Sequence, residues 1–475
     1  MTFGRTARLL GGLLLGLIAI ALLLPLGAVA ALWWANRHDD ALRPEVAAAM
    51  AFTPPNAEAM RRNGYFTMMG LAAPPDEDAH AAGERFFAVQ LAGYEHFRQT
   101  GDDKAAAPPP FKPTAVPAAP LRCDAEVRDC YAHYVDNAAA ARQALAEQAV
   151  LLQRYLSLRT LPVYEEVVPP YTGVQFAYYQ HLVAASELVG VRAALAWQAG
   201  RRDEALALLA ANAQLHQRLW TGARTLLGGM IVLAMDLRQQ RLVAALARTL
   251  RPGDAAAPWA ALQALLITPP PAPDMLLGER QLALGTFDML LLQTWLDSVV
   301  RQPAARWGAN SLTRMAYLPH ATLNASYDDW QQAMALASVP ADQFSARADA
   351  LRRDWADRLQ GEGKLPVRLR NASGHVLLGM TGAFTMQPFL ERIHDVEGHR
   401  RLVRLLIAAR RDAVPVAGMP AWLARQPDAL RDPYLKRPMA WEADTQTLVF
   451  AGRQKNPQNE APQSEYRVRW AATGG

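Results

Sequence analysis

Cysteine is nearly absent from this 475-residue chain, which contains only Cys123 and Cys130. Two cysteines without nearby histidines do not complete a tetrahedral zinc shell. Outside the cytoplasm an isolated pair usually oxidises, and we therefore predict a Cys123–Cys130 disulfide. A straight helix over this separation would hold the Cα atoms about 10 Å apart, whereas a disulfide needs less than about 7 Å. A bridge thus requires a turn or break between them, and the alternative is two free thiols on one helix.

Lysine and net charge are also scarce. The chain has five lysines, and its 49 basic and 44 acidic residues leave a net charge of +5. So small an excess over this length is not the basic footprint of a nucleic-acid-binding protein, and we expect no nucleic-acid partner. Hydrophobic residues make up 51% of the chain and charged residues 20%, which predicts a large packed core rather than extended disorder.

Signatures of cofactor binding are missing. The sequence has no glycine-rich phosphate loop and no HExxH motif, so we expect no cofactor. The nearest approach to a metal site is Glu391 with His394, one helical turn apart, followed by Asp395 with His399. A site with two histidines normally needs further ligands, so we favour a solvated or hydrogen-bonded helix face over a metal site at Glu391, His394 and His399.

A serine and a histidine lie close together in the sequence Asn371-Ala-Ser-Gly-His375. Ser373 lacks the second glycine of a nucleophile elbow, and neighbours in sequence rarely have catalytic geometry, so a turn is the better interpretation. Alternating β-favouring residues flank this turn, and a helix is predicted from about Met386 to Arg411.

Long apolar runs are limited to one, residues 9–34. Crossing a bilayer takes about 20 apolar residues, and Trp33 and Trp34 lie where an interfacial aromatic belt is expected. Arginine greatly outnumbers lysine in this alanine-rich chain, which indicates a GC-rich bacterial coding bias. We therefore predict a single transmembrane anchor in a bacterial inner membrane, with residues 1–8 in the cytoplasm and the bulk of the chain in the periplasm. The alternative is a signal peptide cleaved after Ala30, because Ala28-Val29-Ala30 matches the small-residue cleavage pattern.

A second apolar stretch, Leu219–Leu237, is interrupted by Arg224 and Asp236 and is too short to span. We predict a buried central helix there, in which Gly228-Gly229 allows close helix approach or a kink.

Helical periodicity dominates the rest of the chain. We predict a mainly α fold of stacked helical hairpins, either superhelical or an irregular bundle, with a small C-terminal β element. The predicted segments are a juxtamembrane helical segment (35–104), a proline-rich linker or strap (105–120), a helical domain (121–360), a C-terminal helix with a short β element (361–452) and a flexible tail (453–475). An aromatic stripe, Phe86, Phe87, Tyr94 and Phe97 with Leu91, is predicted to belong to the core.

Two stretches resemble known families. ALAWQAGRRDEALALLAANAQL, with Ala193 and Ala196 before the Gly200 turn, resembles one helix-turn-helix junction of the tetratricopeptide type. Near the end, RDPYLKRPMAW resembles the terminus of uncharacterised, membrane-anchored, mostly helical proteins of Gram-negative bacteria. The resemblance covers about residues 400–452 and implies no activity. A two-stranded unit is predicted there, Met439–Glu442 and Thr447–Ala451.

Arginines give the late helix a basic character, namely Arg392, Arg400, Arg401, Arg404, Arg410 and Arg411. Such a surface would suit anionic lipid or an acidic partner, but a solvated face with internal salt bridges is the more frequent case. Because no convergent polar site is visible, we predict a non-enzymatic interaction or scaffold module of the cell envelope with a protein partner. The alternative is an envelope hydrolase or metal-dependent enzyme using the His394–His399 region.

Overall fold

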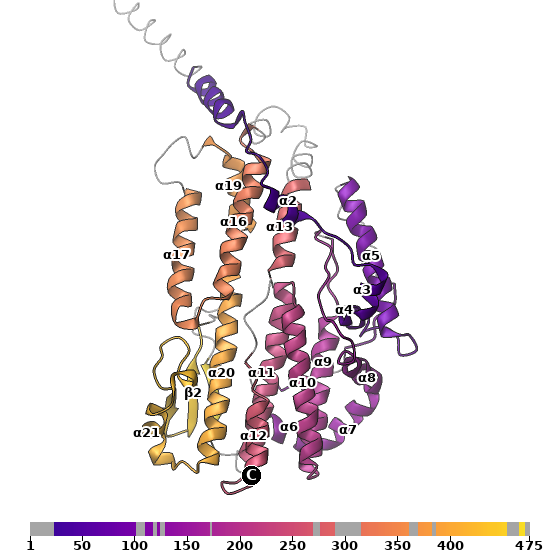
Figure 1. Ribbon diagram of the computed structural model, residues 1–475, viewed down its shortest axis with the longest axis vertical. Coiled ribbons are helices and arrows are strands. Elements are labelled where there is room, and N and C mark those ends of the chain that lie inside the picture. The colour runs from indigo at the N-terminus through magenta and orange to yellow at the C-terminus, as the bar shows by residue number, and fades with distance from the viewer. Residues whose placement is uncertain are drawn as a thin grey trace, which may run out of the picture. The chain divides into compact units, whose positions relative to one another are not determined.

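A computed structural model of the chain describes residues 23–100, 110–116, 121–123, 129–171, 173–268, 276–289, 315–360, 369–381, 386–453 and 465–470 (Figure 1). The chain divides into two compact units. The first comprises residues 1–51, 280–331 and 350–384, and the second comprises 52–279, 332–349 and 385–475. Among the described residues, helices make up the first unit, and helices with one small sheet make up the second, which confirms the mainly α class.

The described part of the chain contains no helix that is long and apolar enough to cross a membrane. Residues 9–22 of the predicted span lie outside the described residues, and residues 23–36 are helical. The membrane anchor therefore stays a prediction.

The first unit is built from α2 (Pro44–Met50), α13 (Leu277–Met289), α16 (Pro319–Ala337), α17 (Ala341–Gln360) and α19 (Ala372–Thr381), of which α13, α16 and α17 continue into the second unit. Its core brings together side chains from four helices, Val46, Leu284, Leu323 and Leu378. The β-favouring residues predicted after Asn371 form the helix α19 instead, so the prediction was wrong there, whereas residues 361–368 before it lie outside the described residues. Asn371 adopts φ 51°, and its Oδ1 accepts a hydrogen bond from the Leu318 backbone N–H at 2.8 Å. This tertiary anchor starts a helix where local β propensity argued against one.

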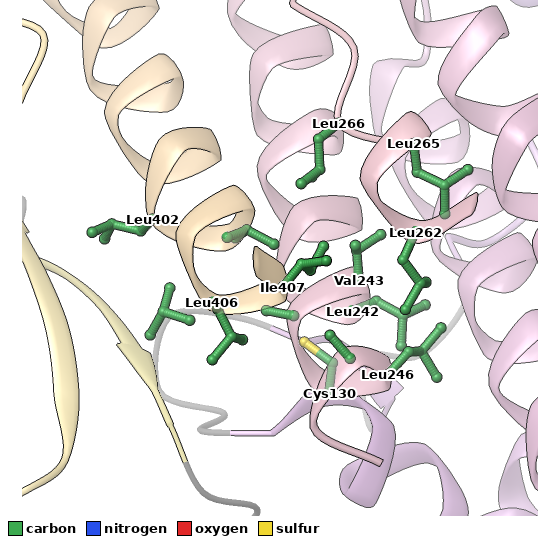
Figure 2. Close-up of a cluster of buried hydrophobic side chains, with 14 of the residues drawn as sticks. Cys130, Leu242, Val243, Leu246, Leu262, Leu265, Leu266, Leu402, Leu406 and Ile407 are labelled. Atoms are coloured by element: carbon green, nitrogen blue, oxygen red, sulfur yellow. The ribbon is translucent and has the colours of Figure 1, made fainter. Parts of the chain in front are cut away.

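The second unit holds most of the elements. Its helices are α3 (Ala57–Arg62), α4 (Gly64–Met69), α5 (Ala79–Thr100), α6 (Cys130–Asp136), α7 (Ala138–Glu147), α8 (Ala149–Ser157), α9 (Tyr179–Gln198), α10 (Arg202–Gly222), α11 (Leu226–Thr249), α12 (Ala256–Ala264), α20 (Gln387–Arg411) and α21 (Met419–Ala424), with short 3-10 turns η4 (Val416–Gly418) and η5 (Asp428–Leu430). Side chains from α6, α11, α12 and α20 meet in its core (Figure 2). Each fully buried leucine there stabilises the fold by about 2 kcal/mol.

The α9–α10 hairpin forms as the tetratricopeptide-like stretch predicts. Gly200 lies between the helices at φ 78°, where an L side chain would be strained. The Arg201 N–H bonds the Ala196 carbonyl at 2.9 Å and the Gly200 N–H bonds the Trp197 carbonyl at 3.0 Å, which is a Schellman motif. A glycine in the left-handed region thus ends α9 and sets the turn.

The buried helix predicted over Leu219–Leu237 is in fact two helices. α10 ends at Gly222 and α11 begins at Leu226, with Thr225 as N-cap accepting the Gly228 N–H at 3.0 Å. Gly228 lies in the first turn of α11 and makes room for Glu166, whose Oε1 would lie 1.9 Å from a Cβ at this position.

The two cysteines are bridged, as predicted, with their Cα atoms 5.4 Å apart. Cys130 is the first residue of α6, and Asp129 caps that helix by accepting the Ala132 N–H at 3.0 Å. Cys123 precedes the helix, so the pair does not share one helix.

The C-terminal sheet has three antiparallel strands in the order β1 (Ala440–Glu442), β2 (Thr447–Ala451) and β3 (Glu465–Arg469). The first two match the predicted unit. β3 lies inside the segment predicted as a flexible tail, and that prediction was wrong for these residues. Val468 on β3 pairs with Leu448 on β2, and both are buried. Pairing with β2 therefore orders a stretch that has little hydrophobic signal of its own.

The described part of the proline-rich segment, residues 110–116, lies as a strap against the second unit's helices. The Thr114 N–H bonds the Ala72 carbonyl at 2.8 Å, and the Phe111 ring lies 6.0 Å from the rings of Phe86 and Tyr178. The aromatic stripe of α5 is buried, as predicted, with Phe86 only 1% exposed.

Candidate functional site

A groove of about 490 Å³ lies in the described part of the second unit. This volume lies within the range of ligand pockets in proteins. Apolar side chains dominate its lining, Val116, Leu121, Ala144, Val183, Ala184, Leu188, Val191, Ile231 and Ala234, and the other lining residues are Arg122, Tyr179, Gln180, Glu187 and Arg238. Since α9 and α11 supply most of them, we call it the α9–α11 groove.

Glu187 on α9 ties the disulfide segment to this groove. Its Oε1 accepts the backbone N–H of Cys123 at 2.6 Å and the hydroxyl of Tyr134 at 3.4 Å. Leu121 and Arg122, which line the groove, directly precede Cys123. The disulfide and the Glu187 carboxylate therefore hold one wall of the groove in place.

The charges at the groove are unequal. Arg122 and Arg238 contribute two positive charges and Glu187 one negative charge. All three side chains already interact with other groups of the chain, so the groove offers a ligand mainly its apolar surface.

Beneath the groove lies a buried polar network that joins α8, α9, α10 and α11. Ser186 Oγ lies 2.9 Å from His216 Nε2, and Asn212 donates to Gln239 Oε1 at 2.7 Å and accepts from the Tyr155 hydroxyl at 2.7 Å. Burial lowers the pKa of His216 to about 4, so the imidazole is neutral at pH 7.

The Ser186–His216 pair resembles part of a nucleophilic dyad, but the space beside it is too small for a substrate. Ser186 is 6% exposed, and the adjoining cavity has about 20 Å³, which is room for one water molecule. The network therefore acts as a fixed polar core beneath the groove.

The structure places the two candidate metal ligands His394 and His399 in separate packing environments. His394 lies 4.9 Å from the Phe344 ring, whereas His399 Nδ1 donates to Gln240 Oε1 at 2.8 Å. Five residues on a helix rotate a side chain by about 140°, so the two imidazoles diverge. Glu391 lies one turn before His394, and its backbone carbonyl accepts the Tyr434 hydroxyl at 3.1 Å.

No group of three or more His, Cys, Asp or Glu side chains within the described residues is arranged to hold a metal ion. Burial lowers the pKa of His394 to about 4 and that of His399 to about 3. The face that we predicted to be solvated or hydrogen-bonded is thus mostly buried, with His399 only 2% exposed.

Arg400 connects α20 to α11 through a buried ion-pair network. It is 1% exposed, its Nη2 lies 2.5 Å from Asp236 Oδ2, and its Nη1 pairs with Glu397. Burial alone would lower the pKa of Arg400, but the two carboxylates outweigh it and raise the pKa. Gln240 completes the network by donating to Asp236 Oδ2 at 2.7 Å.

The other late arginines also bond within the chain. Arg410 donates to the carbonyls of Trp470, Arg248 and Leu250 at 2.8–3.0 Å, and Arg401 donates to Glu397 and the Arg431 carbonyl. The sequence favoured a solvated helix face with internal salt bridges. The salt bridges are present, but the prediction of a solvated face was wrong for Arg400, which is buried. A basic patch for anionic lipid has no support from this helix.

Ser373 and His375 lie in the first turn of α19. Two residues on a helix point about 160° apart, so the serine and the imidazole do not face each other as a dyad. The predicted turn before them is present at Asn371, whose φ is 51°.

Comparison with protein-family models, with curated proteins and with solved structures finds no match to this chain.

The α9–α11 groove was missed at the sequence level. Its signal is a helical stripe, Val183, Ala184, Glu187, Leu188 and Val191, in which one charge interrupts apolar residues at a spacing of three or four. A stripe of this kind is also typical of core packing, and only the placement of α11 and the strap shows that part of it faces a cavity.

Proposed function

We propose that this chain is a non-enzymatic interaction module of the bacterial cell envelope. Residues 9–34 anchor it in the inner membrane, the bulk lies in the periplasm, and the α9–α11 groove binds an apolar segment of a partner protein. The observation that carries the proposal is the groove itself, a mostly apolar cavity of about 490 Å³.

The location in the envelope is supported by two features. Apolar side chains of the helix at residues 23–36 are exposed, with Leu24 at 67% and Trp34 at 63%. An exposed apolar surface of this kind marks a membrane or protein contact. The Cys123–Cys130 disulfide fits an oxidising compartment.

The alternative, an envelope hydrolase or metal-dependent enzyme using His394 and His399, is weaker. Each imidazole is buried in its own surroundings, and a catalytic pair needs both at one reacting atom.

A photo-crosslinking amino acid at Ile231 tests the binding function in cells that express the full chain. Ile231 lines the groove, and Ala184→Trp on the facing helix fills it. We expect adducts with a partner that fall at least tenfold in Ala184→Trp. Ala146→Trp on the exposed face of α7 is the matched control and leaves them unchanged. Absence of adducts, or adducts indifferent to Ala184→Trp, overturns the proposal.

A reporter enzyme fused after residue 475 tests the location. It is expected to be active only if it reaches the periplasm. A mature amino terminus found at Ala31 would show a cleaved signal instead of an anchor.

A further inference from the structure

The segment that follows the predicted span, residues 36–43, is bonded along its length to residues 320–328 and 369–371 of the same unit, and we call it the exit segment. Asn36 begins it with a reciprocal pair of hydrogen bonds. Its Nδ2 donates to the Leu369 carbonyl at 2.6 Å, and its Oδ1 accepts the Asn371 backbone N–H at 2.6 Å. The side-chain amide of Asn36 thereby satisfies one backbone carbonyl and one backbone N–H just before α19.

Asp39 caps a helix far away in the sequence. Its carboxylate accepts the backbone N–H of His320 at 2.8 Å and that of Ala321 at 3.1 Å, at the start of α16. α16 begins with Pro319, which has no N–H, so these are the first two free donors of the helix. A negative charge at this end is also favoured by the helix dipole.

Two arginines fasten the exit segment on either side of Asp39. Arg370 donates to the carbonyls of Ala35 and His38 and pairs with the Asp40 carboxylate. Arg43 donates to the Asn324 carbonyl at 3.0 Å and to Asp328 Oδ1 at 2.6 Å. Contacts on both sides and at both ends distinguish this segment from a flexible linker, which makes no persistent bonds.

The helix before the exit segment ends in residues suited to a lipid headgroup layer. Trp33 and Trp34 are 56% and 63% exposed, and the Arg37 guanidinium carbon lies 3.3 Å from the Trp34 ring centroid. Tryptophan and arginine gather at membrane interfaces because their rings and stems are apolar while their N–H groups reach water and phosphate.

We propose that the exit segment fastens the anchor rigidly to the first unit, with Trp33, Trp34 and Arg37 held in the headgroup layer of the bilayer. The first unit then stands at a set height on the membrane instead of swinging on a tether. This inference rests on the membrane anchor of the proposed function and adds the rigid junction to it. The junction is visible where the indigo helix runs into α2 beside α16 and α19 (Figure 1).

Spin labels on the full chain in phospholipid nanodiscs test the junction. One label replaces Val29, before the exit segment, and the other replaces Arg353, an exposed position of the first unit. Because Cys123 and Cys130 are bridged, only the added cysteines react. We expect a narrow distance distribution that at least doubles in width in the variant Asp39→Ala/Arg370→Ala.

The matched control is Arg411→Ala/Asp412→Ala, which removes an exposed ion pair of the second unit and leaves the width unchanged. A broad distribution without any substitution overturns the rigid junction. So does an unchanged width in Asp39→Ala/Arg370→Ala. If that double variant fails to fold by circular dichroism, Asn36→Ala replaces it with the same expected broadening.

A single label in place of Trp33 tests the headgroup contact separately, through its accessibility to oxygen and to a water-soluble nickel relaxant. Headgroup depth with a broad Val29–Arg353 distribution overturns the rigid junction but leaves the anchor of the proposed function intact. A label in bulk water overturns both. Partner binding at the α9–α11 groove is read out independently by crosslinking at Ile231.

Discussion

Thr225 donates two hydrogen bonds to the carboxylate of Glu166, one from its backbone N–H and one from its hydroxyl, both at 2.9 Å. The Arg224 N–H at 2.9 Å and the Tyr179 hydroxyl at 2.7 Å complete the set of donors. Burial raises the pKa of Glu166, although these four donors act to lower it. A single buried carboxylate thereby sets where α10 ends and α11 begins, which also sets the position of the groove wall on α11.

Glu166→Ala is expected to lower the free energy of unfolding by about 3 kcal/mol, because it leaves buried donors without an acceptor. The measurement is urea unfolding followed by circular dichroism. Glu165→Ala removes the neighbouring carboxylate, which is half exposed and pairs with Arg224, and is the matched control. It should cost less than about 1 kcal/mol. Equal losses in the two variants would show that the buried donors do not matter.

Acid is expected to destabilise the second unit between about pH 6.5 and pH 4. His216 and His394 have folded-state pKa values of about 4, lowered by burial from an unfolded value near 6.5. The unfolded chain binds more protons in that window, so the stability present above pH 6.5 is lost as the pH falls. Each such histidine should cost about 2 kcal/mol at pH 5.

Urea unfolding at pH 7.5 and pH 5.0 measures this dependence. His216→Gln should reduce the difference between the two pH values by about 2 kcal/mol. His96→Gln, on the exposed face of α5, should leave it unchanged. If His216→Gln and His96→Gln behave alike, His216 is not the buried neutral imidazole described above.

Removal of the disulfide is expected to loosen the groove wall. Cys123→Ser/Cys130→Ser releases a short loop, and loop entropy alone predicts a loss of about 2 kcal/mol. Because the Cys123 N–H bonds Glu187, amide hydrogen exchange should also rise at residues 121–123 and in α6. Ser157→Ala, which removes only a local hydroxyl bond on α8, is the control and should change neither. Faster exchange confined to other segments would contradict the assigned role of the bridge.

Gly398→Ala on α20 is expected to destabilise the protein by about 2 kcal/mol, although alanine favours helix over glycine. A Cβ here would lie 2.1 Å from Cε1 of Phe450, which packs the sheet against α20. Gly190→Ala on α9 is the matched control, because its Cβ would meet only a leucine methyl at 3.3 Å. Thermal unfolding of both variants gives the comparison, and a stabilised Gly398→Ala protein would contradict the close packing.

The spacing of residues along the sequence correctly predicted those elements that are specified by residues only a few positions apart. The Gly200 turn, the aromatic stripe of α5 and the β1–β2 pair all follow from the spacing of residues and from turn chemistry. Predictions failed where a distant residue overrides the local signal. α19 forms because Asn371 is bonded to the segment before α16, and α10 stops at Gly222 because Glu166 binds the loop that follows.

The sequence by itself determined the mainly helical class, the α9–α10 hairpin and the disulfide between Cys123 and Cys130. Only the tertiary structure decided that His394 and His399 point apart, that Arg400 is buried between two carboxylates, and that a stripe of α9 lines a groove. The reason is physical. Periodicity reports which face of a helix is apolar, but whether that face meets another helix or a cavity depends on segments far away in the chain.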